Sequence, residues 1–155
     1  MPTEIEHKFL VKKELWKLIV PESSMEVKQG YLLTNPNKTI RVRTKGNKGY
    51  ITIKGKSIGA SRPEFEYEIP LADAIELING FSSNIIEKTR HYLTYESKLW
   101  EVDEFKGFNA GLIVAEIELS DENEKYSIPD WVGENVTEDQ KYANSNLSIK
   151  PYTTW

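Results

Sequence analysis

The sequence predicts an α+β chain rich in β-strands, in which seven or eight antiparallel strands close into a barrel or stack as a sandwich. Two observations carry this prediction. Apolar and polar residues alternate with a period of two along most of the chain, which is typical of half-buried strands. Short turn-forming stretches separate these segments, so consecutive strands are expected to pair antiparallel. The 155 residues suit a single domain over 1–155.

Eight segments have the alternation of strands. They are residues 4–10, 26–34, 39–44, 50–54, 64–69, 85–96, 100–105 and 112–120. Residues 39–44 and 50–54 flank a Gly/Asn-rich loop at 45–49, which predicts a hairpin.

Three further segments have the features of helices. Residues 13–20 place Leu15, Trp16 and Ile19 on one side, and a proline follows. Residues 70–79 carry apolar side chains at helical spacing, and Gly80 is expected to stop that helix. Residues 137–142 begin with a Thr before an acidic first turn and predict a C-terminal helix.

The composition excludes several classes of site. The chain has no Cys, which rules out disulfides, zinc–thiolate sites and thiol nucleophiles. With two His, any metal must be bound mainly by oxygen, as Mg²⁺, Mn²⁺ and Ca²⁺ are. The formal net charge of −4 argues against a nucleic-acid partner. No apolar run could span a bilayer and no signal peptide is apparent, so we expect a cytoplasmic protein without a membrane partner.

Charged residues occupy one face of most predicted strands, and each strand tends to carry one sign. A solvated sheet face also alternates, but like charges two residues apart repel, so it gains nothing from such sorting. The sorting indicates that the charged faces converge on a common interior. The residues concerned are Glu4, Glu6, Lys8, Arg41, Arg43, Lys54, Glu64, Glu66, Glu68, Lys88, Arg90, Glu101, Asp103, Glu116 and Glu118. In this set the acids outnumber the bases, so we expect that an anion enters together with divalent metal ions.

These motifs, taken in order, resemble the CYTH, or triphosphate tunnel metalloenzyme, superfamily over nearly the whole chain. The motifs are Glu4-Ile5-Glu6-His7-Lys8, Arg41-x-Arg43, Thr52-Ile53-Lys54, Glu64-x-Glu66, Glu87-Lys88-Thr89-Arg90, Glu101-x-Asp103 and Glu116-x-Glu118. The resemblance implies a closed eight-stranded antiparallel barrel that forms a tunnel, with a few flanking helices. It also implies a small-molecule triphosphate substrate. The chain looks most like the small bacterial members that hydrolyse inorganic triphosphate to pyrophosphate and phosphate.

The resemblance also implies roles for individual residues. Metal ligands would be Glu4, Glu6, Glu116 and Glu118, with Mg²⁺ as the expected ion and Mn²⁺ as an alternative. Glu66 and Asp103 would bind a second metal or orient the bases through ion pairs. Phosphate would be held by Lys8, Arg41, Arg43, Lys54, Lys88 and Arg90. The expected reaction is in-line attack of a metal-activated water on a terminal phosphorus.

Three residues are expected to take part in the chemistry itself: Tyr31, Lys8 and Lys88. Tyr31 corresponds to a tyrosine near the reacting phosphate in related enzymes, or else it lines the barrel with a structural hydrogen bond. Lys141 would close one tunnel mouth from the C-terminal helix, or lie exposed on it. The sequence leaves open a class IV-type adenylate cyclase, a thiamine triphosphatase and a non-catalytic polyphosphate-binding module, and it is compatible with a homodimer.

Overall fold

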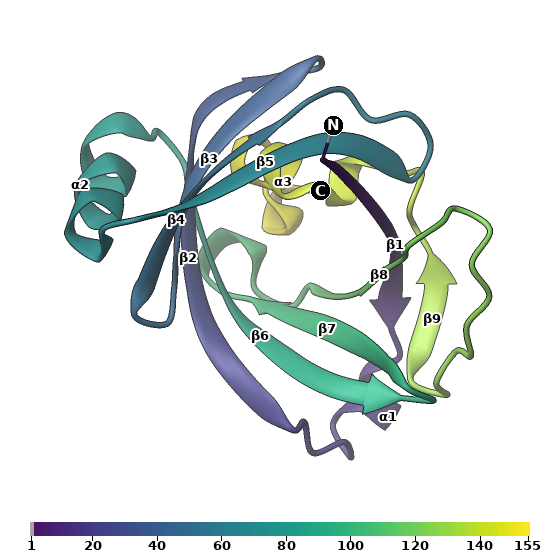
Figure 1. Ribbon diagram of the computed structural model, residues 1–155. Coiled ribbons are helices and arrows are strands. Elements are labelled where there is room, and N and C mark those ends of the chain that lie inside the picture. The colour runs from purple at the N-terminus through teal and green to yellow at the C-terminus, as the bar shows by residue number, and fades with distance from the viewer. Residues whose placement is uncertain (1) are drawn as a thin grey trace.

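In the computed structural model, which describes residues 2–155, the segments with period-two alternation form the strands of a barrel (Figure 1). The strands are β1 (Thr3–Val11), β2 (Ser23–Asn35), β3 (Lys38–Lys45), β4 (Lys48–Lys54), β5 (Ser61–Ile69), β6 (Ile85–Tyr95), β7 (Lys98–Phe105), β8 (Ile113–Glu118) and β9 (Val132–Asn135). The α-helices are α1 (Lys13–Trp16), α2 (Leu71–Phe81) and α3 (Asn144–Ile149). All eight predicted strands are therefore present, and β9 is an additional one.

Antiparallel pairing closes the sheet on itself. Its strand order is β5-β4-β3-β2-β6-β7-β8-β1, and a further pairing of β1 with β5 joins the two ends. Residues 3–5 of β1 pair with residues 61–63 of β5, while the later part of β1 pairs with β9. A sandwich would leave two separate sheets, so the closed eight-stranded barrel predicted from the resemblance is confirmed.

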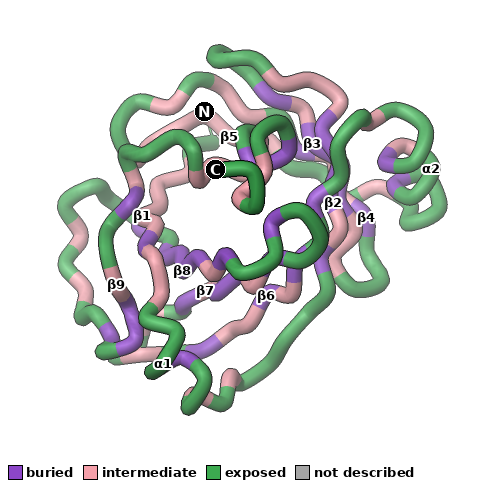
Figure 2. The backbone as a smooth tube through the Cα atoms, turned by 180° about the vertical axis from the view of Figure 1, so that it is seen from behind, coloured by how far each residue is buried: buried purple, intermediate pink, exposed green. Residues whose placement is uncertain are grey.

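The main apolar cores lie on the outer side of the barrel wall. Phe9, Trp100 and Ile117 point outward from β1, β7 and β8 and pack with Trp131 from the segment that leads into β9. On the opposite wall, α2 covers β3 and β4, and its Ala74 packs on the sheet. Figure 2 shows buried backbone segments running along these strands. Because side chains alternate across a strand, the charged residues between these apolar positions face the interior.

The close approach of α2 requires a glycine on β4. A β-carbon placed on Gly49 would lie 2.6 Å from the Cβ of Ala74, closer than packed atoms come. Any larger side chain at this position would push the helix away from the sheet, so Gly49 sets the distance between α2 and the wall.

One end of the barrel interior is apolar and is covered by α3. Ile86, Phe105 and Val114 point inward there and pack around Leu147 of α3, which is fully buried. On the same strands, the charged side chains that point inward lie between this apolar end and the opposite end of the barrel. The interior is therefore a charged cavity with an apolar floor, and we call the opposite, open end the mouth.

The predicted helix at residues 13–20 is wrong beyond Trp16. Leu18 and Val20 are 74% and 90% exposed, and Val20 precedes Pro21, which disfavours helical backbone at the residue before it. The apolar spacing there does not produce a buried helix face.

The remaining differences concern element ends. The helix predicted to stop at Gly80 continues to Phe81. The predicted loop at 45–49 is a tighter turn, because β3 ends at Lys45 and β4 begins at Lys48. The predicted helix at 137–142 is replaced by a short 3₁₀ turn at Gln140–Tyr142, with α3 following it. Among residues 2–155, no helix has the length and apolar character needed to cross a membrane.

Candidate active site

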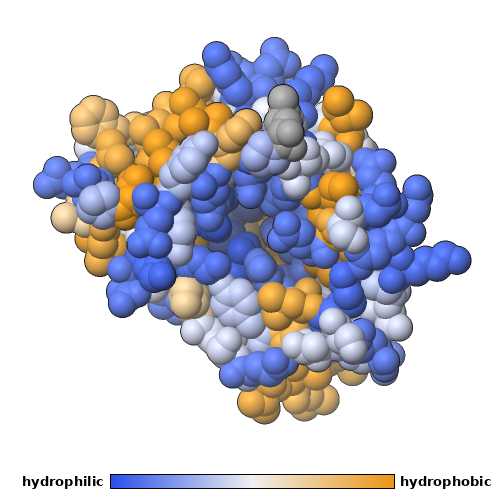
Figure 3. All heavy atoms as spheres, viewed as in Figure 1, coloured by the Kyte–Doolittle hydropathy of each residue, from blue (hydrophilic) through white to orange (hydrophobic). Residues whose placement is uncertain are grey.

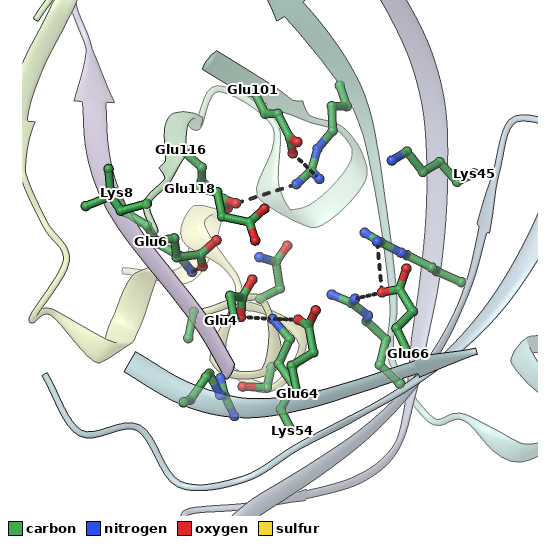
Figure 4. Close-up of a pocket in the computed structure, with 18 of the residues that line it drawn as sticks. Glu4, Glu6, Lys8, Lys45, Lys54, Glu64, Glu66, Glu101, Glu116 and Glu118 are labelled. Carbon is green, nitrogen blue, oxygen red and sulfur yellow. Dashed lines mark hydrogen bonds and ion pairs between the residues drawn. The ribbon is translucent and has the colours of Figure 1, made fainter. Parts of the chain in front are cut away.

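The inner faces of the strands enclose a cavity of about 660 Å³. Figure 3 shows it as a hollow lined by hydrophilic side chains, and Figure 4 shows charged residues pointing into it from opposite walls. The predicted site residues that line it are Glu4, Glu6, Lys8, Tyr31, Arg41, Arg43, Lys54, Glu66, Lys88, Arg90, Glu116 and Glu118. Asp103 lies fully buried in the wall beside Lys88 and Arg90.

Asp103 binds two of the predicted phosphate ligands at once. Its Oδ1 accepts from Nε of Arg90 at 2.7 Å, and its Oδ2 lies 2.8 Å from Nη2 of Arg90 and 2.7 Å from Nζ of Lys88. Burial would raise the pKa of this carboxyl, but the Arg90 and Lys88 cations outweigh burial and hold it well below its usual range. Both carboxylate oxygens are thus occupied by bases.

Glu66 orients the arginines of β3 in a similar way. Its Oε2 lies 3.3 Å from Nη2 of Arg43 and 3.6 Å from Nη2 of Arg41, and it accepts from the Thr52 hydroxyl at 3.0 Å. Arg41 also donates to the Thr52 hydroxyl at 3.1 Å. The two guanidinium groups are therefore held side by side on the cavity wall.

Lys54 joins two carboxylates from different strands. Its Nζ lies 2.8 Å from Glu4 and 3.2 Å from Glu64. Burial alone would raise the pKa of Glu4, yet the Lys54 cation and its hydrogen bond lower it to about 2. Glu4 is therefore ionised at neutral pH.

The carboxylates of β1 and β8 crowd together, and the cations nearest to Glu6 and Glu116, Lys8 and Arg90, lie no closer than 3.7 Å. Glu6 on β1 stands directly opposite Glu118 on β8, an arrangement in which like charges destabilise a sheet. Burial, Glu116 and Glu4 raise the pKa of Glu6 well above its usual range. Burial, with Glu4 among the nearby acids, also raises the pKa of Glu118.

This crowding fits a hard divalent cation, which would supply the missing positive charge to an all-oxygen set of ligands. Within residues 2–155, no three acidic or imidazole groups already converge at metal-binding distance. A bound ion would therefore draw the carboxylates of β1 and β8 toward it.

The three residues predicted to act in the chemistry lie on two sides of the cavity, Lys8 on β1 and Tyr31 and Lys88 on the paired strands β2 and β6. Lys8 points from β1 toward Glu6, 3.7 Å away, and Tyr31 accepts a hydrogen bond from Gln29 at 3.0 Å. Lys88 donates to Oδ1 of Asn144 on α3 at 3.1 Å as well as binding Asp103. Burial lowers the pKa of Lys88 to about 8, and the nearby carboxylates only partly offset it.

Sequence reasoning missed three bases of the cavity: Lys45, Arg62 and Lys98. With them, nine basic and seven acidic side chains line the cavity, so the expected excess of acids over bases is wrong. Glu68, expected inside, is exposed and pairs with Lys48 at the rim. Lys141 does not close the mouth: its Nζ lies over the ring of Trp155, 4.6 Å from the centroid.

The fold and the lining together define a class: a closed barrel whose charged interior can hold a polyanion together with cations. Comparison with known proteins then identifies the family. Residues 2–150 match the CYTH domain family. An inorganic triphosphatase from Acetivibrio thermocellus is 46% identical over 153 residues, which cover 98% of this chain and 97% of that protein. The chain belongs to the CYTH family.

More distant relatives share the fold over nearly the whole length. An inorganic triphosphatase from Nitrosomonas europaea is 34% identical and covers 95% of this chain and 97% of its own. The crystal structure of the inorganic triphosphatase NE1496 superposes with a TM-score of 0.66 at 30% identity, covering 96% of each chain. Triphosphatases of this family depend on metal ions in general.

Proposed function

We propose that this chain is an inorganic triphosphatase, which hydrolyses triphosphate to pyrophosphate and phosphate. The observation that carries the proposal is the cavity itself, in which bases from six strands line one space and several of them are oriented by Glu66 and by the buried Asp103. The activity named for the two relatives described above supports the same substrate.

The phosphate groups of the substrate would be bound by two arrays of bases. Arg41 and Arg43, fixed by Glu66, offer guanidinium forks that match phosphate oxygens. Lys88 and Arg90, fixed by Asp103, face them from β6. Because these bases are held in place before the substrate arrives, they stabilise charge that develops on the phosphoryl oxygens without reorganising.

Glu4, Glu6, Glu116 and Glu118 would hold Mg²⁺, with Mn²⁺ as a substitute. When bound, such an ion neutralises phosphate charge and lowers the pKa of a water molecule. Glu66 and Asp103 instead serve the bases, since the carboxylate oxygens described above are engaged by cations or by Thr52.

Hydrolysis proceeds by in-line attack of water on a terminal phosphorus. The new oxygen–phosphorus bond forms as the bridging bond breaks, and the pyrophosphate leaves with its charge neutralised by the bases around it. The Lys8 ammonium and the Tyr31 hydroxyl, which line the cavity from opposite walls, are placed to donate to phosphoryl oxygens. Lys88 has one N–H left for the substrate after its bonds to Asp103 and Asn144.

The lining favours free triphosphate over a nucleotide. Among the described residues that line the cavity, Tyr31 is the sole aromatic side chain, and it contributes to the apolar cluster at the floor. A purine ring inside the cavity would therefore have one aromatic side chain to stack on, because the rings of Tyr50 and Tyr92 already lie against Arg43 and Lys45.

A substrate panel tests the proposal. Phosphate release with Mg²⁺ is measured for triphosphate, thiamine triphosphate, ATP and pyrophosphate, and ATP is also assayed for cyclic AMP. We expect triphosphate to be cleaved fastest, and Glu116→Gln to abolish turnover while the rim variant Glu68→Gln retains it. Faster formation of cyclic AMP would contradict the proposal, and triphosphate binding without turnover would indicate a binding module.

Arg41→Ala is expected to lower kcat/KM for triphosphate by about 100-fold, since one bidentate charged contact contributes about 1.5–3 kcal/mol. The free energy of unfolding, measured in urea, should fall by less than the roughly 3–5 kcal/mol of a broken buried ion pair, because Arg43 still pairs with Glu66 in the variant. Equal losses of activity and stability would instead point to a structural ion pair with Glu66.

A further inference from the structure

The bases that line the cavity differ in whether a carboxylate balances them. Arg41, Arg43, Lys54, Lys88 and Arg90 each lie within ion-pair distance of at least one acid, as do Lys8 and Lys98. Among residues 2–155, Lys45 and Arg62 are the two lining bases without such a pair. Arg62 is held by two hydrogen bonds to the carbonyl of Gly55, whereas among residues 2–155 the Lys45 ammonium has neither an ion pair nor a side-chain hydrogen bond.

Lys45 occupies the last inward position of β3, two residues beyond Arg43. Its Nζ lies over the ring of Tyr92, 5.6 Å from the centroid, and Figure 4 shows the ammonium pointing into the cavity. Gly46 follows in the left-handed region with φ +61°, and the chain turns back into β4. The side chain is half-buried, so its charge is only partly solvated.

The strand directions place Lys45 at the mouth. Tyr31 and Ile86 mark the floor on β2 and β6, and Lys45 pairs with Val27, four residues away from Tyr31 along β2. At about 3.3 Å per residue, the backbone from Arg41 to Lys45 spans about 13 Å. The end phosphorus atoms of a triphosphate are separated by only two P–O–P bridges, so this row of bases covers the whole anion.

We propose that Lys45 binds the phosphate group of triphosphate nearest the mouth and thereby selects triphosphate over pyrophosphate. This inference rests on the proposed function. Arg41 and Arg43, the bases that precede Lys45 on β3, are partly neutralised by Glu66 and bind either anion. Pyrophosphate has one phosphate fewer than triphosphate, so when these two arginines hold it, it lacks the group that would reach Lys45, whereas triphosphate gains a charge-assisted contact there.

Lys45→Met tests the proposal, because it removes the charge and keeps the length of the side chain. We expect KM for triphosphate to rise about tenfold, which corresponds to one charged contact. We expect kcat and the inhibition constant of pyrophosphate to change by less than about twofold. Lys45→Arg should restore KM to near the wild-type value.

Lys48→Met is the matched control. Lys48 is the register partner of Lys45 across the same turn, but it pairs with Glu68 outside the cavity. This variant should leave KM and the pyrophosphate inhibition constant unchanged. An equal rise of both constants in Lys45→Met, or no change in either, would overturn the selective role of Lys45.

Calorimetric binding separates this inference from the proposed function. If the wild-type chain binds triphosphate without cleaving it, the triphosphatase proposal fails. The role of Lys45 would still be supported if Lys45→Met weakened binding of triphosphate about tenfold and left pyrophosphate binding unchanged. Equal weakening of the two anions would overturn it.

Discussion

Asp103 shows how a single residue can support both the wall and the site. It is fully buried, and its carboxylate compensates the buried charges of Lys88 and Arg90. Removing one member of such a group leaves uncompensated charge in a medium that solvates it poorly. The cost therefore appears in stability as well as in activity.

Asp103→Asn is expected to lower the free energy of unfolding by about 3–5 kcal/mol, measured by urea denaturation at pH 7. The control is Glu68→Gln, which breaks the exposed pair with Lys48 and should cost less than about 1 kcal/mol. Similar losses in the two variants would show that Asp103 does not carry the buried charge balance.

Glu4 makes the free energy of unfolding depend on pH, and urea denaturation of the metal-free protein can measure this dependence. Its pKa is about 2 in the folded chain and about 4.3 when unfolded, so the unfolded state binds more protons between these values. The stability that Glu4 contributes is therefore present above about pH 4.3 and is lost as the pH falls toward 2. We expect a smaller loss over this range in Glu4→Gln, and an unchanged slope would contradict the assignment.

The two faces of the barrel wall have different roles. Because side chains alternate along a strand, the apolar ones point outward and pack against α2 and the segment before β9, and the charged ones point inward and line the cavity. Period two was therefore enough to predict eight strands and most of the cavity lining. It was not enough for β9, whose four residues, Val-Gly-Glu-Asn, are too few to show alternation.

The contact between α2 and β4 can be tested with a pair of glycines. Gly49→Ala should destabilise the chain by about 1–3 kcal/mol, because its new methyl group meets Ala74. Gly80→Ala, in the same helix, has open space around it and should stabilise by up to about 1 kcal/mol. Urea denaturation measures both, and a neutral Gly49→Ala would show that α2 can move freely.

At the scale of the whole molecule, three bases escaped prediction for a topological reason. Lys45 was assigned to the loop at 45–49, and Arg62 and Lys98 lay between predicted strands, so none of the three was given a strand face. Closure of the barrel brings the beginning of β5 beside β1, and the tight β3–β4 turn keeps Lys45 in the strand. Such placement depends on long-range pairing, which local periodicity does not contain. For Glu68 the strand was predicted correctly, but the prediction that its side chain lies inside was wrong. A correct strand assignment does not show where the cavity ends.

The excess negative charge on β1 and β8 should be visible in the thermal stability of the whole chain. Without metal, Glu6→Gln is expected to raise Tm at pH 7.5, because it removes a carboxylate whose pKa is already raised by burial and by Glu116. Adding Mg²⁺ should raise Tm of the wild-type chain and have less effect on the variant. Calorimetric scans with Mg²⁺ or EDTA measure this, and equal Mg²⁺ responses would argue against Glu6 as a ligand.

The outward position of the apolar clusters has a spectroscopic consequence. Trp16, Trp100 and Trp131 pack together on the far side of the wall from the cavity, and Trp155 makes edge-to-face contacts with Tyr142 and Tyr152. The tryptophan fluorescence will therefore report the loss of tertiary structure and will hardly respond directly to anions bound in the cavity. A thermal melt followed by this fluorescence can be interpreted as unfolding, even when anions are present in the sample.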